Sequence, residues 1–179
     1  MPLTLICCIF SFFVPTESLS TRLSSSEEQA ITACRIAIHK AEGSYRIPPR
    51  LLESIALIES GRSTGAATSY PWPWTVTVNG KGHYFPTRSE AIAAVRRFQA
   101  RGARNIDVGC MQINLFHHPK AFKSLQEAFD ITQNVSYAAK FLKELQEQYA
   151  SWSKAVGCYH SATPHLHGAY RHRVLKKWA

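Results

Sequence analysis

Acidic residues are scarce in this chain: 12 Asp and Glu stand against 21 Lys and Arg, which gives a formal net charge of +9 at pH 7. A basic chain favours a polyanionic partner, for which nucleic acid and the acidic bacterial wall are the candidates. The sequence has no zinc-finger spacing, no helix-turn-helix pattern and no aromatic-plus-basic RNA-binding motif, so we predict no nucleic-acid partner. It also lacks internal repeats. Its 179 residues, 45% of them hydrophobic, predict one globular domain.

The chain has no apolar run long enough to cross a membrane as a helix. The longest, Leu3–Val14, is shorter than the ~20 residues that such a span needs. Its position and length predict a signal peptide at 1–20, with small residues for cleavage at Ser18-Leu19-Ser20, although no Lys or Arg precedes it. A misassigned start or a buried strand are the alternatives. We therefore expect a domain at 21–179 that is exported to the periplasm or secreted, with no stable membrane span.

Cysteines are few, and their spacing excludes a structural zinc site. Cys7 and Cys8 would leave with the signal peptide, so Cys34, Cys110 and Cys158 remain. An odd number leaves at least one thiol free or paired between chains. Cys34 and Cys158 could meet if their helices are neighbours, but the sequence leaves the pairing open. We predict neither a metal nor a cofactor.

Helical patterns dominate what is present. They predict helices over 24–43, 48–60, 87–101, 119–128, 132–149, 152–159 and 164–178, with capping boxes at Ser24/Glu27 and Thr87/Glu90. The pattern breaks at 62–86, where 75–78 and 83–85 alternate like strands around Asn79-Gly80-Lys81-Gly82, a β-hairpin signal. Residues 104–114 are expected to be extended or turns. The predicted class is mainly α (α+β) with one small hairpin.

Glu59 is the main candidate for chemistry. It follows the apolar run 51–58 and precedes Ser60-Gly61, where the helix is expected to end. Desolvation and the negative end of the helix dipole both raise the pKa of a carboxyl group. A carboxyl that stays protonated near neutral pH can act as a general acid. The alternative is an ordinary glutamate on a helix surface.

Two later segments complete a pattern. They are Gly109-Cys110-Met111-Gln112-Ile113-Asn114 and Gly157-Cys158-Tyr159-His160. Together with Glu59-Ser60 they resemble the three motifs of the soluble lytic transglycosylases, lysozyme-like enzymes that cut bacterial peptidoglycan. Cys110 stands where the family has Leu, and His160 stands where it has Asn. Asn134-Val135 and Tyr170-Arg171-His172-Arg173-Val174 are also similar to family segments, so the ordered resemblance covers roughly residues 30–175.

The resemblance implies a lysozyme-like helical domain with the small hairpin bordering a cleft. It implies that Glu59 is catalytic and that Ser60, Met111, Gln112, Asn114 and Tyr159 bind the substrate, peptidoglycan glycan strands. Gly109 would let backbone approach a sugar, Met111 would lie against a sugar face, and Gln112 would bond hydroxyl and acetamido groups. Tyr159 would reach towards Glu59 or the sugar. The implied reaction cleaves the bond between N-acetylmuramic acid and N-acetylglucosamine and closes a 1,6-anhydro ring.

Three points stay open. Most glycosidases use two carboxyl groups, and of Glu53, Glu90 and Asp107 only the last remains a possible partner for Glu59. Two rival functions remain. One is a hydrolytic muramidase like goose-type lysozyme, and the other is a non-catalytic wall-binding module of a cell-envelope secretion machine. The aromatic residues of the 70–86 insertion could stack on sugar or form the hairpin's own core; they are Trp72, Trp74, Tyr84 and Phe85.

Overall fold

The computed structural model describes residues 23–63, 68–161 and 163–179. The predicted signal peptide at 1–20 lies outside the described residues. The helices are α1 (Ser25–Tyr45), α2 (Leu51–Ser60), α3 (Arg88–Ala100), α4 (Leu125–Ala128), α5 (Ile131–Tyr149), α6 (Trp152–His160) and α7 (Pro164–Trp178). The strands are β1 (Gly61–Ser63), β2 (Ser69–Pro71), β3 (Thr75–Val78), β4 (Lys81–Tyr84), β5 (Ile106–Val108) and β6 (Ile113–Asn114). The predicted mainly α class is confirmed. Within the described ranges, no helix is long and apolar enough to cross a membrane.

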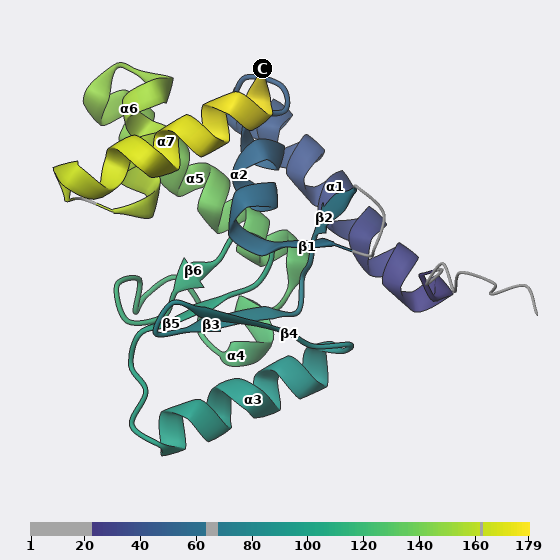
Figure 1. Ribbon diagram of the computed structural model, residues 1–179. Helices are drawn as coiled ribbons and strands as arrows, with labels where there is room; N and C mark the ends of the chain where they lie inside the picture. The colour runs from purple at the N-terminus through teal and green to yellow at the C-terminus, as the bar shows by residue number, and fades with distance from the viewer. Residues whose placement is uncertain (1–22, 64–67, 162) are drawn as a thin grey trace, which may run out of the picture.

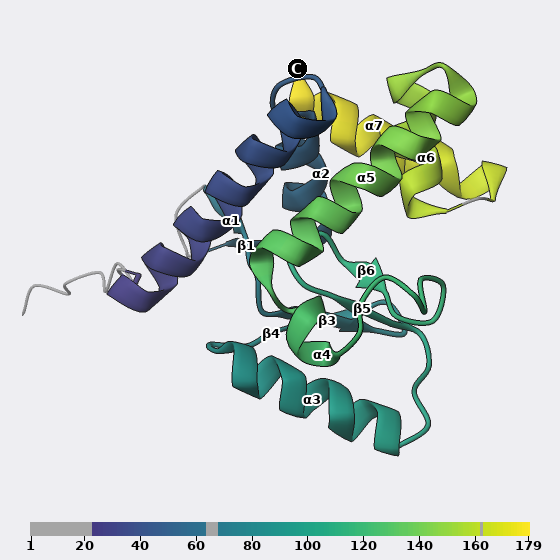
Figure 2. The same ribbon diagram turned by 180° about the vertical axis from the view of Figure 1, so that it is seen from behind.

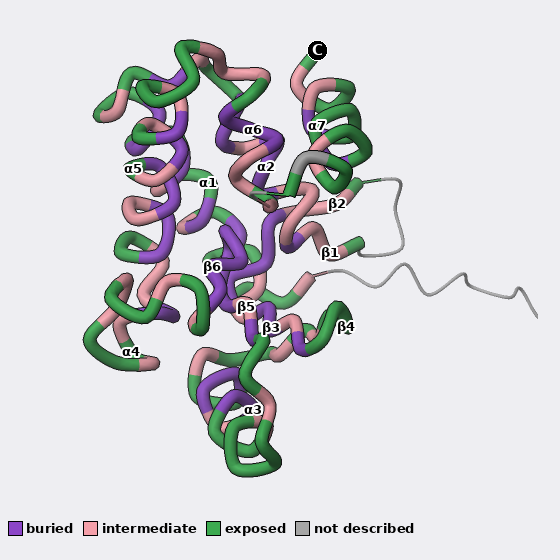
Figure 3. Tube along the Cα trace, turned by 90° about the vertical axis from the view of Figure 1, so that its left-hand side faces the viewer, coloured by how far each residue is buried: buried purple, intermediate pink, exposed green. Residues whose placement is uncertain are grey.

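The elements form two packed parts, one made of helices and one built around the larger sheet (Figures 1 and 2). Helices α1, α2, α5, α6 and α7 enclose one apolar core, which includes Leu52, Ile55 and Leu142. Strands β3 and β5 pack against α3 and α4 around a second core, which includes Val76 and Val108. In both views α3 lies beyond the sheet from the helical part. Figure 3 shows the buried backbone concentrated in α2, along one side of α5 and in the central strands.

The start of α2 is fixed by a buried carboxylate from α1. Glu42 is only 5% exposed, and its oxygens accept hydrogen bonds from the backbone N–H groups of Arg50, Leu52 and Glu53 at 3.0, 2.9 and 3.3 Å. These N–H groups have no partner inside the helix, and a negative charge is favourable at a helix N-terminus. The direction of α2, and hence the place where its last turn arrives, is set from this end.

The predicted hairpin is present and belongs to a larger sheet, but its second strand begins at Lys81, within the predicted turn, and ends at Tyr84. β3 and β4 pair antiparallel, with Val78 opposite Lys81, so the turn has two residues, Asn79 and Gly80. Both have positive φ (50° and 80°), which an Asn-Gly turn adopts readily. The strand order is β4-β3-β5-β6, because 106–108 and 113–114 pair rather than remain irregular. Separately, β1 and β2 form a two-stranded sheet.

Several predicted boundaries were wrong for local reasons. α1 continues past Gly43 to Tyr45, because Arg46 takes the left-handed cap conformation at φ 53°. The prolines at 48 and 49 precede α2 instead of opening it, and Arg50 is the N-cap residue. The helix predicted at 119–128 is reduced to α4, whose N-cap is Ser124. In each case a cap decides the boundary that apolar periodicity leaves open.

Candidate active site

Glu59 lies in the last turn of α2, at the point where the chain passes from the helical part to the strands. The helix ends at Ser60, as predicted from Gly61. Gly61 has an ordinary negative φ of −58°, but a Cβ there would lie 2.2 Å from the carbonyl oxygen of Leu57. Only glycine permits this close turn out of the helix. The turn leaves Glu59 partly exposed while Ser60 and Trp72 beneath it are buried.

Tyr170 is the hydrogen-bond partner of Glu59. Its hydroxyl group donates to Oε1 of Glu59 at 2.5 Å, from a residue 111 positions later in α7. Tyr170 is 2% exposed and belongs to the helical core. The packing of α7 on α2 therefore decides where the Glu59 carboxyl group points.

The pKa of Glu59 is raised from 4.5 to about 7. Burial of the carboxyl group is the main cause, since a charge is poorly solvated inside protein. The hydrogen bond from Tyr170 and the positive charge of Arg173 act in the opposite direction, and the negative charge of Asp107 adds to the increase. Near neutral pH the group therefore exists in both protonation states, as a group that first donates and then accepts a proton requires.

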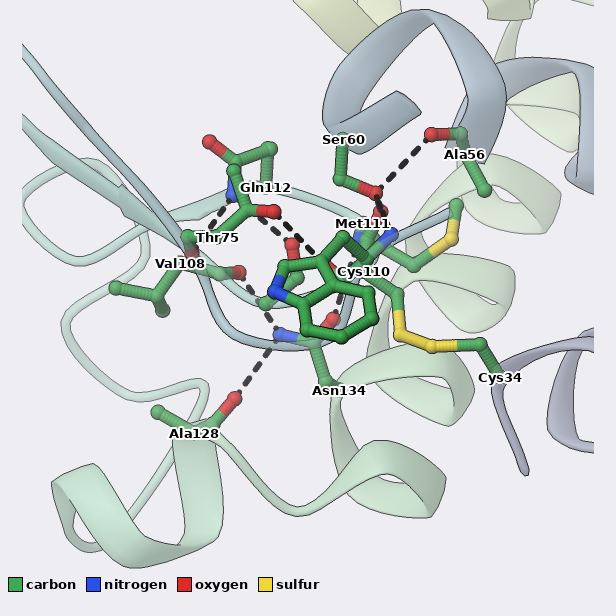
Figure 4. Close-up of a disulfide and its surroundings, with 12 residues drawn as sticks. Cys34, Ala56, Ser60, Thr75, Val108, Cys110, Met111, Gln112, Ala128 and Asn134 are labelled. Atoms are coloured by element: carbon green, nitrogen blue, oxygen red, sulfur yellow. Dashed lines mark hydrogen bonds between the residues drawn. A yellow bond between two sulfur atoms is a disulfide. The ribbon is translucent and has the colours of Figure 1, made fainter. Parts of the chain in front are cut away.

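The 109–114 segment meets α2 through Ser60. The Ser60 hydroxyl group donates to the carbonyl oxygen of Cys110 at 2.6 Å and is also close to the Ala56 carbonyl oxygen at 3.2 Å (Figure 4). The backbone N–H of Trp72 bonds the carbonyl oxygen of Ser60 at 3.1 Å. Ser60 is fully buried, so it supports the site from behind and presents no surface to a ligand.

Gly109 is required by protein packing. Its φ is +84°, and a Cβ would lie 2.4 Å from Nδ2 of Asn134. The amide group of Asn134 donates to the carbonyl oxygens of Val108 and Ala128 at 3.0 Å each and accepts from the N–H of Met111 at 3.0 Å (Figure 4). Asn134 from α5 thus holds the whole segment, and the neighbour that approaches Gly109 is this amide rather than a sugar.

A disulfide fixes the same segment from the opposite side. Cys34 of α1 is bonded to Cys110, with 6.8 Å between their Cα atoms (Figure 4). Both residues are buried, and Cys158 is free. The pairing of Cys34 with Cys158, one that the sequence left open, is therefore not formed. It fails because α1 packs against the segment that carries Cys110.

Among the predicted binding residues, Gln112 has a side-chain oxygen that makes no hydrogen bond within the described chain. Its Nε2 donates to the carbonyl oxygens of Thr75 and Gly109 at 3.1 and 2.9 Å. Its Oε1 is buried and has no hydrogen-bond partner within the described chain. The residue has a φ of 47°, so a turn presents it. Because an unpaired buried acceptor costs about 1–3 kcal/mol, a donor from a ligand would be favourable here.

Met111 and Asn114 are largely used by the protein itself. The Met111 side chain is fully buried in the helical core, away from any surface on which a sugar could lie. The Asn114 amide donates to Asn105 at 2.6 Å and to Asp107 at 2.8 Å, and it accepts from the N–H groups of Phe116 and His117 at 3.0 and 2.9 Å. Both residues act through the shape of the loop.

Tyr159 and His160 lie at the end of α6, next to Tyr170. The Tyr159 hydroxyl group donates to the carbonyl oxygen of Met111 at 2.8 Å. Of the two partners expected for Tyr159, Glu59 or the sugar, Glu59 is bonded by Tyr170 instead. The exposed imidazole of His160 stacks on the Tyr170 ring, with 4.5 Å between the ring centroids and 10° between the planes. Burial lowers the pKa of His160, and the charge of Arg173 lowers it further.

Asp107 brings a second carboxyl group to the site. Burial raises its pKa, and the hydrogen bond from Asn114 opposes that increase. Its charge acts on the pKa of both Glu59 and Tyr159, so it lies within electrostatic reach of the acid. Among the described residues, no group of three or more His, Cys, Asp and Glu is arranged to hold a metal ion.

The aromatic residues of the insertion mainly support the fold. Trp72 is 1% exposed, and its Nε1 donates to the carbonyl oxygen of Phe85 at 2.8 Å. Trp74 and Phe85 pack against the second core. Tyr84 is exposed, and its hydroxyl group donates to the carbonyl oxygen of Gly61 at 3.0 Å, which ties the hairpin to the end of α2.

Two residues of this site were not among the predicted ones. Tyr170 and Asn134 appeared only as parts of similar segments, without roles. The only signal for Tyr170 in the sequence is its spacing of four residues from Val174, which places both on one face of a helix. Val174 is buried. For Asn134 the signal is a polar residue beside Val135 on the buried face of α5.

The helical fold around one half-buried acid defines a lysozyme-like protein, and the comparisons identify its family. The chain matches the family described as "Transglycosylase SLT domain" over residues 36–173 and belongs to it. This match spans the three motifs and the first part of α7, including Tyr170. Comparison with curated proteins found no match, and comparison with solved structures found none either.

Proposed function

We propose that this protein is a peptidoglycan lytic transglycosylase that cleaves the β-1,4 bond from N-acetylmuramic acid to N-acetylglucosamine and leaves 1,6-anhydro ends. Membership of the transglycosylase family supports the substrate class. The observation that carries the proposal is Glu59, with its pKa near 7 and its hydrogen bond from Tyr170.

Glu59 performs both proton transfers. In its neutral form it protonates the glycosidic oxygen, and the bond breaks with positive charge on the muramic sugar. The resulting carboxylate then takes the proton of the C6 hydroxyl group, whose oxygen closes the anhydro ring. The Tyr170 hydroxyl group stabilises that carboxylate between the two steps, since hydrogen bonds to ionised groups are strong. No water is consumed, and Glu59 ends protonated as it began.

Gln112 orients the substrate. Its unpaired Oε1 accepts a hydrogen bond from a sugar hydroxyl or acetamido N–H group. The segment that presents Gln112 is held by Ser60, by Asn134 and by the Cys34–Cys110 disulfide. Positioning of this kind lowers the barrier by keeping the reacting atoms in place.

The test is digestion of purified sacculi by the chain, followed by mass spectrometry of the soluble muropeptides. Anhydro-ended products are expected from the wild type, and none from Glu59→Gln. Unchanged release by Glu59→Gln would favour a contaminating activity and leave the chain as a non-catalytic wall-binding module of a secretion machine. A matched control is Glu53→Gln, in the same helix with a solvent-accessible ion pair to Arg35.

Asp107 supports one alternative, a hydrolytic muramidase. A second carboxylate could activate a water molecule, which would give reducing ends instead of anhydro ends. The two functions separate in Asp107→Asn. Under transglycosylation the variant still forms anhydro ends, because the substrate supplies its own nucleophile, whereas under hydrolysis product formation is lost.

Export to the periplasm or outside the cell is part of the proposal. The Cys34–Cys110 disulfide supports it, since structural disulfides persist in oxidising compartments. The expected result is a mature N-terminus near residue 21, found by sequencing the protein recovered from the periplasm or medium. An intact N-terminus on cytosolic protein would contradict export.

A further inference from the structure

The α6–α7 end of the chain carries no negative side chain. No Asp or Glu follows Glu147 in the sequence, whereas five lysines and arginines do. They are Lys154, Arg171, Arg173, Lys176 and Lys177, and all five are exposed. These helices also supply Tyr170, the partner of Glu59. Helices α6 and α7, which supply the partner of Glu59, therefore carry basic side chains and no acidic ones.

Two of the side chains from these helices surround Tyr170 itself. The His160 ring is stacked on the phenol, and the guanidinium carbon of Arg173 lies 5.9 Å from the centroid of the same ring. Both side chains are exposed, and no ion pair of Arg173 is found among the described residues. The Arg173 guanidinium group and the His160 imidazole thus both lie against Tyr170, the residue that is hydrogen-bonded to Glu59.

The ligand that fits these groups is a carboxylate. Guanidinium groups bind carboxylates through two parallel hydrogen bonds. The amino sugars of a glycan strand are neutral once the lactyl group of muramic acid is linked to a peptide, so the negative charges of the substrate reside on the peptide stems. The muramic residue at the cleaved bond carries its stem on the same sugar ring, so the stem begins close to the bond that Glu59 protonates. His160 and Arg173 are the groups next to Tyr170, the partner of Glu59.

We propose that His160 and Arg173 bind a carboxylate of the peptide stem, so that stem-bearing strands are the preferred substrate class. This inference rests on the proposed function. Arg173 makes the ion pair, and His160 donates a hydrogen bond from the face of Tyr170. The remaining basic residues of α7 contribute only a general attraction for anionic strands.

The test measures binding to two substrates that differ only in the stems. Glycan strands with peptide stems are compared with the same strands after an amidase has removed the stems and the lactyl carboxylates that this frees have been converted to amides. Both are titrated against Glu59→Gln, which is expected to bind without cutting. The expected dissociation constant is about tenfold lower for stem-bearing strands, the size of one charge-assisted contact at an exposed site. This advantage decreases as salt rises.

Arg173→Gln in the Glu59→Gln background should reduce the tenfold advantage to below about threefold. Arg171→Gln is the matched control, because it removes the same charge from an exposed arginine of the same helix. Arg171 lies two residues away from Arg173 on a different face of α7 and does not belong to the Tyr170 stack. Arg173→Lys should keep part of the advantage. The ratio of the two dissociation constants cancels any effect on folding or on sugar binding that both strands share.

An equal affinity of the Glu59→Gln protein for the two strands would overturn the inference, as would an equal loss of the ratio in Arg171→Gln and Arg173→Gln. Failure of the proposed function has a different signature, since the wild-type chain would then release no 1,6-anhydro-ended product from either strand.

Discussion

The Tyr170 hydroxyl group donates a 2.5 Å hydrogen bond to Oε1 of Glu59. The bond joins the last turn of α2 to α7 across 111 positions of sequence, in a site whose acid has a pKa of about 7. Because the bond favours the ionised carboxyl group while burial favours the neutral one, the proton affinity of Glu59 is a balance that single substitutions can shift.

Tyr170→Phe removes the donor and keeps the ring. Loss of a hydrogen bond to a charged group, at about 1.5–3 kcal/mol, should lower the rate of muropeptide release roughly 10- to 100-fold. The pKa of Glu59 should rise further, so the fall of activity on the alkaline side moves to higher pH. The pH profile of the rate measures both effects. Tyr45→Phe, which loses only a bond to Ser136, should change neither; an unshifted profile in Tyr170→Phe would contradict the assigned role.

Glu59→Gln should stabilise the fold at alkaline pH and not in acid. The folded state raises the pKa of Glu59 from 4.5 to about 7, so it prefers the neutral carboxyl group, and ionisation lowers its stability as pH rises from about 4.5 through 7. Glutamine is neutral at every pH and can still accept the bond from Tyr170. We expect a gain of ~1–3 kcal/mol at pH 8 and close to none at pH 4. Urea unfolding at the two pH values checks this, and an equal change at both would count against the raised pKa.

Removing the disulfide should destabilise the protein. Cys34→Ala with Cys110→Ala opens a loop closed over a separation of 76 residues, at a cost of about 2–4 kcal/mol in unfolding free energy. The double variant should also lose activity, because Cys110 precedes Met111 and Gln112. Cys158→Ala is the control, since Cys158 is free. Equal stability of the double variant and Cys158→Ala in denaturant titration would contradict the Cys34–Cys110 disulfide.

Gly109→Ala should be strongly destabilising. The methyl group would lie 2.4 Å from the Asn134 amide at a φ of +84°, so it must displace the side chain that holds the segment. We expect a loss of more than about 2 kcal/mol in thermal or urea unfolding. Gly43→Ala is the opposite case: it has nothing within 4 Å and lies in α1, so alanine should gain about 0.5–1 kcal/mol. Similar losses at both positions would mean that the Asn134 contact is not the cause.

Local patterns predicted most of the helices and the position of the acid. The apolar run of α2 followed by Ser60-Gly61 predicted the helix end, because the exit of the chain from the helix is a local property. It also predicted the direction of the pKa shift of Glu59, although the burial behind the shift and the effects of Tyr170, Asp107 and Arg173 come from tertiary packing. Of the strands beyond the hairpin, β5 and β6 lie in the segment 104–114, which was predicted only as extended or turn structure, without pairing. β5 and β6 have three and two residues, too few for a two-residue period to be recognised.

The predicted binding residues differ in how the structure places them. Gln112 has a buried Oε1 without a hydrogen-bond partner among the described residues, and its role in binding stays a prediction. Ser60 and Met111 were assigned to substrate from a motif, and the structure has both fully buried. A motif records which residues a site needs, whereas burial decides which of them face the ligand and which support those that do.

By itself the sequence determined a basic, mainly helical domain with a single acid at the end of an apolar helix, since composition and helical periodicity act over a few neighbouring residues. Tertiary packing decided the partners: Tyr170 for Glu59, Asn134 for Gly109, and Cys34 for Cys110. Each pair joins positions far apart in the chain, and contacts of that kind depend on how helices pack, which no local pattern encodes.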